Sequence, residues 1–211
     1  MHFFVESKRC RPEVKTVIIV SPDHYLVGTR PITTHAESYL VYGKTIEVDV
    51  PRLLSLRKKI PSLQSNPTLF FEEHGVGVLA PFIANVWPRA KIVPFVVRSD
   101  IDRQTSEQFA GWLREQSRNP GVFILVSSDM SHYLDDGTAR KNDQTTKQAF
   151  RTKDEDFFWT AKDGFTDNGR GISTVIRSLP SSTWLQFEQG ISTQYQGSPG
   201  FTTSYLTGFW K

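Results

Sequence analysis

The sequence predicts an α/β protein with a central, mostly parallel or mixed sheet that is flanked by helices. Three apolar runs rich in β-branched residues predict buried strands: "KTVIIVSPDHY" at 15–25, "KIVPFVVRSD" at 91–100 and "GVFILVSSD" at 121–129. Continuous apolar runs are typical of parallel strands that are covered on both faces. Stretches with helical spacing separate these runs, so strands and helices alternate along the chain.

Helical spacing is clearest in two segments. "DVPRLLSLRKKI" at 49–60 has Pro51 in its first turn and closely spaced leucines behind it. "TSEQFAGWLREQSRN" at 105–119 has large apolar residues at i, i+3 and i+4, with Ser106 or Thr105 as its expected N-cap. Both segments are predicted helices.

The remaining elements follow in order. "HGVGVLAPFIANVWPRA" at 74–90 is apolar on most sides and predicts one buried helix, although its glycines and Pro81 oppose it. Residues 138–178 are expected to be helical with a Gly-rich break. "STWLQFEQGISTQY" at 182–195 and "TTSYLTGFW" at 202–210 alternate like strands, and the "GSPG" between them predicts the turn of a closing hairpin.

Length and composition bound the class of protein. The chain has 211 residues, 38% of them hydrophobic, which predicts a single domain over 1–211. No apolar run approaches the roughly 18 to 20 residues that span a membrane. The net charge of +3 is spread along the chain, so nucleic-acid binding is not expected. The single cysteine, Cys10, and the lack of a long apolar leader favour a cytoplasmic protein.

Polar side chains follow two of the predicted strands at the point where each strand ends. Asp23 and His24 follow the first strand, and Asp129 and His132 follow the third. Because ligands of α/β sheets bind beyond the carboxyl ends of strands, we expect these four residues at one rim. Two imidazoles and a carboxylate are the ligand set of non-heme iron sites, and they also suit zinc or copper. The same groups can instead act as general acid and base without a metal.

Each of these residues also has a structural interpretation. A histidine at a strand end often does no more than hydrogen-bond to its surroundings, and Asp129 can cap the turn that follows it. The serines of the third strand tip, Ser127, Ser128 and Ser131, lack the Gly-x-Ser-x-Gly surroundings of a nucleophile elbow. Catalysis by a nucleophilic serine is therefore not predicted.

A third candidate is His74, which follows Glu72 and Glu73 in "FFEEHGVGVLAPF". An acid next to a histidine at the start of a helix can orient a ligand or a substrate. The structural alternative is that acidic residues simply favour a helix N-terminus.

Several stretches, which together cover nearly the whole chain, carry a family resemblance. They are "VIIVSPDHY", "EEHGVGVLAPFI", "KIVPFVVR", "FILVSSDMSHYLD", "DNGRGISTVI" and "TSYLTGFW". In order and spacing they resemble the Memo family, also called AmmeMemoRadiSam system protein B, which is similar in fold to class III extradiol dioxygenases. The first resembles the family's strand ending in Gly-Pro-Ser-His, the second its Glu-His-Ser-Ile-Glu segment and the fourth its Ser-Ser-Asp-x-x-His motif. "DNGRGISTVI" falls where the family usually has Cys-Gly-x-x-Pro-Ile.

This resemblance implies an α/β fold with a histidine-lined pocket that binds a redox-active metal, iron or copper. His24 matches a pocket histidine that is a metal ligand, His132 matches the histidine after Ser-Ser-Asp, and His74 matches the Glu-His histidine. The implied metal ligands are His24 and His132, the implied catalytic residues are His74, His132 and Asp129, and the implied pocket residues are Asp23, Glu73, Ser128 and Tyr195.

The sequence departs from the family motifs in three places. The family's first strand ends in Pro-His-Ala-Gly-Tyr, whose histidine is another ligand, and His2 in "MHFF" lies too near His24 to match it. Tyr195 aligns with a late cysteine that is a ligand in some members, and a phenolic oxygen does not replace a thiolate for copper. Val76 and Gly77 occupy the place of the second acid of the Glu-His segment. The implied site is poorer for copper than for iron.

The expected function is that of a Memo-like protein whose pocket binds a redox metal or a small ligand, with catalysis not implied. Two alternatives remain open. One is a non-heme metal-dependent oxidoreductase of the extradiol dioxygenase type, in which His24, His132 and Asp129 hold Fe(II) while His74 moves protons. The other is a non-enzymatic module that binds a protein or peptide. The small-molecule ligand or protein partner is not specified by the sequence.

Overall fold

A computed structural model describes residues 2–179, 182–196 and 201–211, without the side chains of residues 187, 195 and 196. Within these residues a five-stranded sheet has the strand order β5-β2-β6-β1-β7. β1 pairs in parallel with β6 on one side and with β7 on the other, and β2 joins β6 antiparallel, so the predicted α/β class with a mixed sheet is confirmed. The strands are β1 (Thr16–Pro22), β2 (Ile32–Thr34), β5 (Gln64–Ser65), β6 (Lys91–Val97) and β7 (Val122–Val126).

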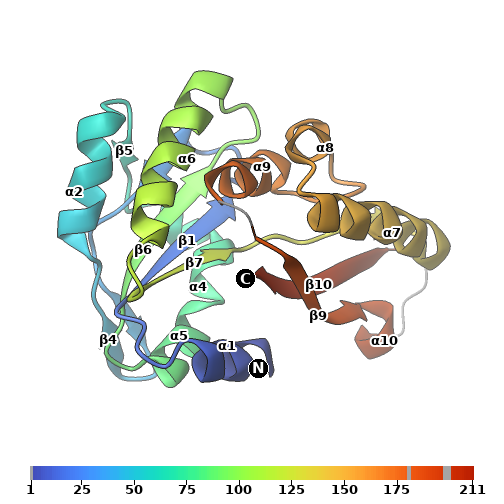
Figure 1. Ribbon diagram of the computed structural model, residues 1–211, viewed down its shortest axis with the longest axis horizontal. Helices are drawn as coiled ribbons and strands as arrows, with labels where there is room; N and C mark the ends of the chain where they lie inside the picture. Colours follow the sequence, from blue (N-terminus) through green and yellow to red (C-terminus); the bar gives the residue numbers. More distant parts are fainter. Residues whose placement is uncertain (1, 180–181, 197–200) are drawn as a thin grey trace.

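Helices cover both faces of this sheet (Figure 1). α2, α6 and α9 lie on one side, and α4 and α5 lie on the other with α1 beside them. α7 lies beside the C-terminal hairpin, and α8 packs against α9. The helices are α1 (His2–Cys10), α2 (Val50–Lys59), α3 (Leu69–Glu72), α4 (His74–Gly77), α5 (Ala80–Val86), α6 (Arg103–Ser117), α7 (Asp136–Thr152), α8 (Glu155–Thr160), α9 (Gly169–Ser178) and α10 (Thr193–Gln196).

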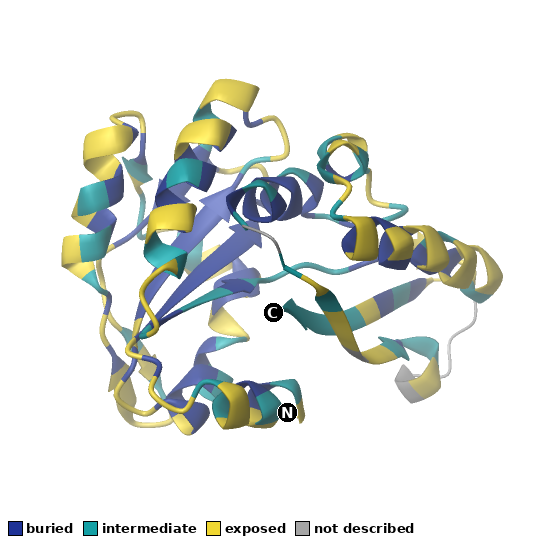
Figure 2. Ribbon diagram, in the orientation of Figure 1, coloured by how far each residue is buried: buried dark blue, intermediate teal, exposed yellow. Residues whose placement is uncertain are grey.

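The core lies on both faces of β1 and β6, whose ribbons are almost wholly buried (Figure 2). Large side chains fill it from both helical layers, among them Trp87 after α5 and Trp112 of α6, each at most 2% exposed. Such double coverage explains why the strand sequences are continuously apolar instead of alternating. β7, at the end of the sheet, is only half-buried at Phe123, Ile124 and Val126.

The two clearest predicted helices are confirmed as α2 and α6, with one correction. α6 begins earlier than expected, because Asp102 is its N-cap and accepts a hydrogen bond from the backbone N–H of Thr105 at 2.8 Å. Thr105 and Ser106 therefore lie inside the first turn. An aspartate carboxylate is as good a cap as a serine hydroxyl, so the sequence offered several adjacent candidates.

The single helix expected over 74–90 was wrong, since the chain forms two short helices, α4 and α5. Pro81 stands in the first turn of α5, where its missing N–H costs nothing, but the same proline cannot continue α4. Because of this break α4 is short, and it lies beside β1 with His74 as its first residue.

The C-terminal segment forms the predicted hairpin, in which β9 (Trp184–Ile191) pairs antiparallel with β10 (Thr202–Trp210). The strand expected over 182–195 ends early, because Thr193–Gln196 is the helix α10. The "GSPG" turn lies outside the described residues. β8 (His132–Leu134) adds to the other side of β10, which the sequence did not predict. A separate small hairpin joins β3 (Tyr39–Val41) to β4 (Lys44–Ile46). The expected helical region forms α7, α8 and α9, with breaks at 153–154 and 161–168. The Gly-rich break was wrong, because Gly169 and Gly171 lie in the first turn of α9.

Over the described part of the chain, none of the helices combines the length and the apolar character needed to pass through a membrane.

Candidate functional site

The ends of β1 and β7 lie side by side, as expected for neighbouring parallel strands. The amide of Asn168, in the loop before α9, donates to the carbonyl of Ser127 at 2.8 Å and to that of Val20 at 3.4 Å. These two bonds tie the loop 161–168 across both strand ends. The loop 161–168 therefore borders the candidate site together with the ends of β1 and β7.

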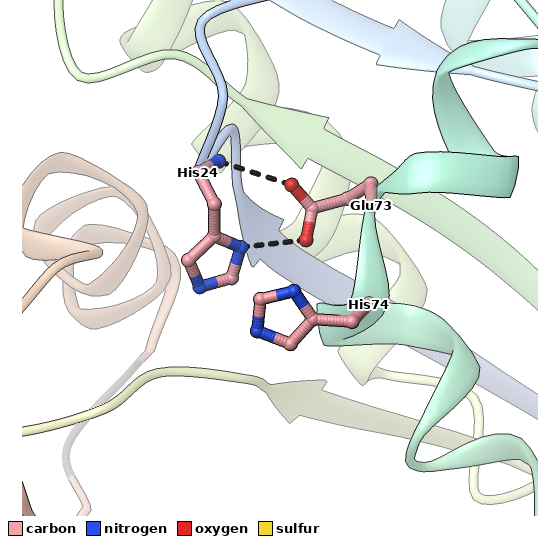
Figure 3. Close-up of side chains that lie close together, drawn as sticks. All are labelled: His24, Glu73 and His74. Atoms are coloured by element: carbon pink, nitrogen blue, oxygen red, sulfur yellow. Dashed lines mark hydrogen bonds and ion pairs between the residues drawn. The ribbon is translucent and has the colours of Figure 1, made fainter.

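Glu73 is the residue that holds His24. One oxygen of its carboxylate lies 2.6 Å from His24 Nδ1 and also accepts the N–H of Gly75, while the other accepts the backbone N–H of His24 at 3.0 Å (Figure 3). Glu73 is 3% exposed and is also the N-cap of α4. A side chain at Gly75 would collide with Ser21, so this glycine lets α4 lie directly against β1.

The other ring nitrogen of His24 meets a carboxylate that the sequence analysis missed. Nε2 lies 3.1 Å from Asp167 Oδ2, and the second oxygen of Asp167 accepts hydrogen bonds from the Ser128 hydroxyl at 2.8 Å and from the Asp129 N–H at 3.0 Å. Asp167 thus links His24 to the end of the third predicted strand. The available signal was its place in "DNGRG", where the family's Cys-Gly motif falls.

Two carboxylates around one imidazole decide its charge. Burial alone would lower the pKa of His24, but the hydrogen bonds to Asp167 and Glu73 and the charges of both outweigh it and raise the pKa to about 10. Burial would likewise raise the pKa of Glu73, but the bonds from His24 and Gly75 hold it below its ordinary value. In the metal-free protein, His24 is therefore an imidazolium between two carboxylates.

His74 completes the cluster. Its ring stacks on that of His24, with 4.2 Å between centroids and 27° between planes, and it comes from the exposed start of α4 (Figure 3). One donor atom from each of His24, Glu73 and His74 lies within 4.8 Å of the others, a spacing at which the three could share a cation. His74 is exposed, so the cluster is open to solvent on this side.

Asp129 lies in the electrostatic reach of the same group. Burial, and then the negative charge of Asp167, raise the pKa of Asp129, although His132, His24 and His74 act in the opposite direction. The site thus concentrates acidic groups around its histidines, an arrangement that attracts a cation.

His132 sits at the start of β8, where its Nδ1 donates to the carbonyl of Met130 at 2.8 Å. It is buried and is not part of the donor group formed by His24, Glu73 and His74 among the described residues. Ser128 lies in the site through its bond to Asp167 and a second hydroxyl contact of 2.6 Å with Thr166.

Asp23 and Tyr195 are the remaining predicted pocket residues, and the structure describes the side chain of Asp23 only. Both oxygens of Asp23 accept backbone N–H groups of the loop that follows, from Val27 at 3.1 Å and Gly28 at 2.8 Å. Asp23 therefore shapes the loop behind His24. Tyr195 belongs to α10, and its side chain lies outside the described residues.

The donors fit a first-row transition metal. Imidazole nitrogen and carboxylate oxygen suit Fe(II), zinc or Cu(II), whereas Cu(I) prefers thiolates, and Cys10 lies exposed on α1. Two ligands of one metal at bond lengths of about 2.1 Å lie about 3 to 3.5 Å apart, and the 3.1 Å between His24 Nε2 and Asp167 Oδ2 falls in this range. Binding would replace the proton that this pair now shares.

Comparison with known proteins agrees with the fold. The family model described as "Memo-like protein" matches residues 5–207. A MEMO1 family protein of Caldivirga maquilingensis is 25% identical over 97% of this chain and 72% of its own, and one of Aquifex aeolicus is 27% identical over 90% and 70%. The crystal structure of the uncharacterized protein JW3007 from Escherichia coli K12 superposes with a TM-score of 0.66 at 12% identity, covering 95% of this chain and 89% of that one. The match over nearly the whole sequence shows that the chain belongs to the Memo-like protein family.

Proposed function

We propose that this protein binds a divalent metal, Fe(II) by preference, at the rim formed by the ends of β1 and β7. The observation that carries this proposal is the arrangement of His24, whose Nδ1 is held by the buried Glu73 while its Nε2 faces Asp167. A carboxylate that fixes one ring nitrogen and leaves the other for a metal is the usual outer partner of a ligating histidine.

The roles of the two carboxylates follow from where each one lies. Glu73, whose side chain is 1% exposed, holds Nδ1 and the backbone N–H of His24 and caps α4, so it orients the ring. Asp167 faces Nε2 at 3.1 Å and would hold the ion with His24. The exposed side chain of His74 would turn toward Asp167 to complete two imidazoles and a carboxylate, since Glu73 is the carboxylate of the present three-donor group. When bound, Fe(II) in such a set supplies a Lewis acid and a redox centre with positions open to a small ligand.

The test is the metal content of anaerobically purified protein that has been offered Fe(II), Zn(II) or Cu(I). We expect near-stoichiometric Fe(II), reduced to background in His24→Ala and strongly reduced in Asp167→Asn. Asp163→Asn removes an exposed carboxylate from the same loop and should leave the metal content unchanged. Metal that persists in His24→Ala, or its absence from the unmodified protein, would overturn the proposal.

His132 is a predicted ligand that the proposed set does not include. The His132→Ala variant decides its role by the same measurement. Full metal content in this variant would assign His132 to the support of Met130 and β8, and loss of metal in a folded variant would place it among the ligands.

A further inference from the structure

β7, the last strand of the five-stranded sheet, has an edge that none of the described strands covers. β1 pairs with its other edge, where the N–H of Ser127 donates to a carbonyl of β1 at 2.9 Å. Backbone N–H and C=O groups point alternately to the two edges of a strand, so those of Ile124 and Val126 point to the open edge. The carbonyl of Val122 points the same way, and it accepts from the guanidinium of Arg11 at 3.0 Å, in the place of a neighbouring strand.

β10 has an open edge of the same kind. β9 pairs with one side of β10 from Ser204 onward, whereas β8 pairs on the other side only with the first two residues of β10. The N–H and C=O of Ser204 bond to residues 131 and 130 on that side. By the same alternation the backbone groups of Leu206 and Gly208 also point there, where none of the described strands continues. Lys211, three positions after Gly208, bonds instead to Thr183 on the side of β9, as the alternation requires.

The two open edges border one cavity of about 600 Å³. It is lined by every residue from Val122 to Met130 and by every residue from Tyr205 to Lys211. Successive side chains of a strand point to opposite faces of the sheet, so a cavity that meets all of them runs along the edge of the strand. In Figure 1 this edge of β7 faces the hairpin. The two rows of open backbone groups therefore lie on opposite sides of the same gap.

Apolar side chains cover both faces of this gap. Phe4 of α1 and Phe82 of α5, whose rings stack with 5.3 Å between centroids, line it from one helical layer. Ile172 and Val175 of α9 line it from the other. A strand in this position would be covered on both faces, as β1 and β6 are, so its sequence would be a continuous apolar run.

The open edges decide what kind of molecule fits the gap. An apolar molecule without a peptide backbone would leave the N–H and C=O groups of both edges unpaired, whereas an extended peptide offers donors and acceptors to both at once. A second copy of this chain has no such segment to spare, because its continuously apolar strands β1 and β6 lie inside its own sheet. The gap therefore favours a peptide from another protein.

We propose that β7 and β10 capture an extended, continuously apolar peptide segment of another protein as an additional strand. The backbone of this segment pairs with Ile124 and Val126 on one side and with Leu206 and Gly208 on the other, and so joins the five-stranded sheet to the hairpin. Main-chain hydrogen bonds supply the affinity of such strand addition, and the apolar walls supply its specificity. The inference goes beyond the proposed metal site, because none of these four residues is a proposed ligand.

The test uses the full chain and a fluorescein-labelled peptide with the sequence "KTVIIVSP", residues 15–22 of this chain, as a model of a continuously apolar strand. We expect saturable binding of one peptide per chain, measured by fluorescence anisotropy. The same peptide with lysine in place of Val17 and Ile19 presents charges to one wall of the gap. It should therefore fail to compete.

Two N-methylated peptides separate strand pairing from unspecific apolar binding. Neighbouring residues of a strand direct their N–H groups to opposite edges, so a methyl group on the nitrogen of Ile18 blocks one edge and a methyl group on that of Ile19 blocks the other. Each peptide should bind about tenfold more weakly than the unmodified one. Undiminished binding of either peptide would refute pairing with both edges.

A protein variant tests the edge of β7 directly. Ile124→Pro removes an N–H that points into the gap, and proline is tolerated in an edge strand when its nitrogen faces away from the ladder. We expect peptide binding about tenfold weaker or lost, with the fold checked by circular dichroism. Ile124→Val keeps the N–H and is the matched control, which should bind like the unmodified protein. If Ile124→Pro does not fold, Leu206→Pro makes the same change on β10.

Amide hydrogen exchange measured by NMR locates the bound peptide. The peptide should slow exchange at Ile124, Val126, Leu206 and Gly208, and it should leave Leu125, whose backbone faces β1, unchanged. Absence of saturable binding, or binding without slower exchange at these four amides, would overturn the inference. So would a dimer of the free protein that protects the same amides, since a second copy would then be the occupant.

Discussion

His24 and His35 are two histidines that each follow a strand of the same sheet and that have opposite properties. His24 follows β1 and lies between two carboxylates, with its pKa raised to about 10. His35 follows β2 and lies against Phe70 and Tyr39, where burial lowers its pKa to about 4. A position after a strand therefore does not make a histidine a site residue, because its neighbours decide its chemistry.

The difference arises from strand direction. β1 is parallel to β6 and β7, so the carboxyl ends of all three strands lie on one side of the sheet. His24 follows β1 on that side, where the loop that contains Asp167 also lies. β2 runs antiparallel to β6, so His35, which follows β2, lies toward the amino end of β6 and away from His24. There the ring accepts the N–H of Glu37 on Nδ1 and donates through Nε2 to the Tyr39 hydroxyl at 2.6 Å, which is the bonding of a neutral imidazole.

The largest effect expected from this comparison is the acid sensitivity that His35 confers. Its folded-state pKa lies below the unfolded value near 6.5, so its stabilising contribution is present above pH 6.5 and is lost as the pH falls toward 4. A shift of this size corresponds to on the order of 3 kcal/mol. Urea unfolding at pH 7 and pH 4 should show a smaller loss of stability in His35→Phe than in the unmodified protein. Equal losses would show that His35 does not titrate this way.

The next effect concerns Glu73, which distinguishes the surroundings of His24 from those of His35. Glu73→Gln keeps the size of the side chain but removes the charge that fixes His24, so metal affinity should fall about 10- to 100-fold. Competition titration with a chromophoric chelator measures this change. Glu72→Gln, an exposed neighbour, is the matched control and should leave the affinity as it is. Unchanged affinity in Glu73→Gln would contradict the orienting role.

A smaller effect, with the opposite sign of pH dependence, is expected from His24 in the metal-free protein. Its pKa is raised on folding, so its contribution is present below pH 6.5 and is lost as the pH rises toward 10. Its side chain remains 20% exposed, so solvent screens its ion pairs and keeps the effect below that of His35. Between pH 6.5 and 10 the unmodified protein should lose more stability than His24→Gln. Parallel curves for the two proteins would argue against the paired imidazolium.

The smallest effect is expected at His2, which meets Glu188 on the surface. The side chains of this pair are 59% and 50% exposed, so His2→Ala should change stability by about 0.5 kcal/mol or less and leave the metal content unaltered. Urea unfolding and elemental analysis check both points. A larger loss would mean that α1 depends on this contact for its position.

Much of the architecture was predictable because it depends on patterns along the chain. The continuous apolar runs predicted β1, β6 and β7, and the alternating residues of the last segments predicted the β9–β10 hairpin. The division of 74–90 into α4 and α5 was missed, because the apolar pattern continues through Pro81 while the backbone hydrogen bonds do not.

The candidate site was predictable only in part. His24, Glu73 and His74 were candidates from the sequence, and the fold places them in one cluster. Asp167 was not a candidate, because its place in the family pattern marks the segment "TDNGRG" but does not show that the loop folds back over the end of β1. His35 was not a candidate, and no local sequence signal shows the environment that separates it from the site.

The sequence by itself determined the long strands β1, β6 and β7, the β9–β10 hairpin, the helices α2 and α6, the family and the types of side chain available at the strand ends, since these depend on the order and spacing of residues. Only the tertiary structure decided which carboxylate faces which ring nitrogen, which histidine is charged, and that β7 borders a cavity reaching Asp129. The physical reason is that hydrogen bonds and charges act over a few ångströms, and residues as far apart as His24 and Asp167 come within that distance only in the folded chain.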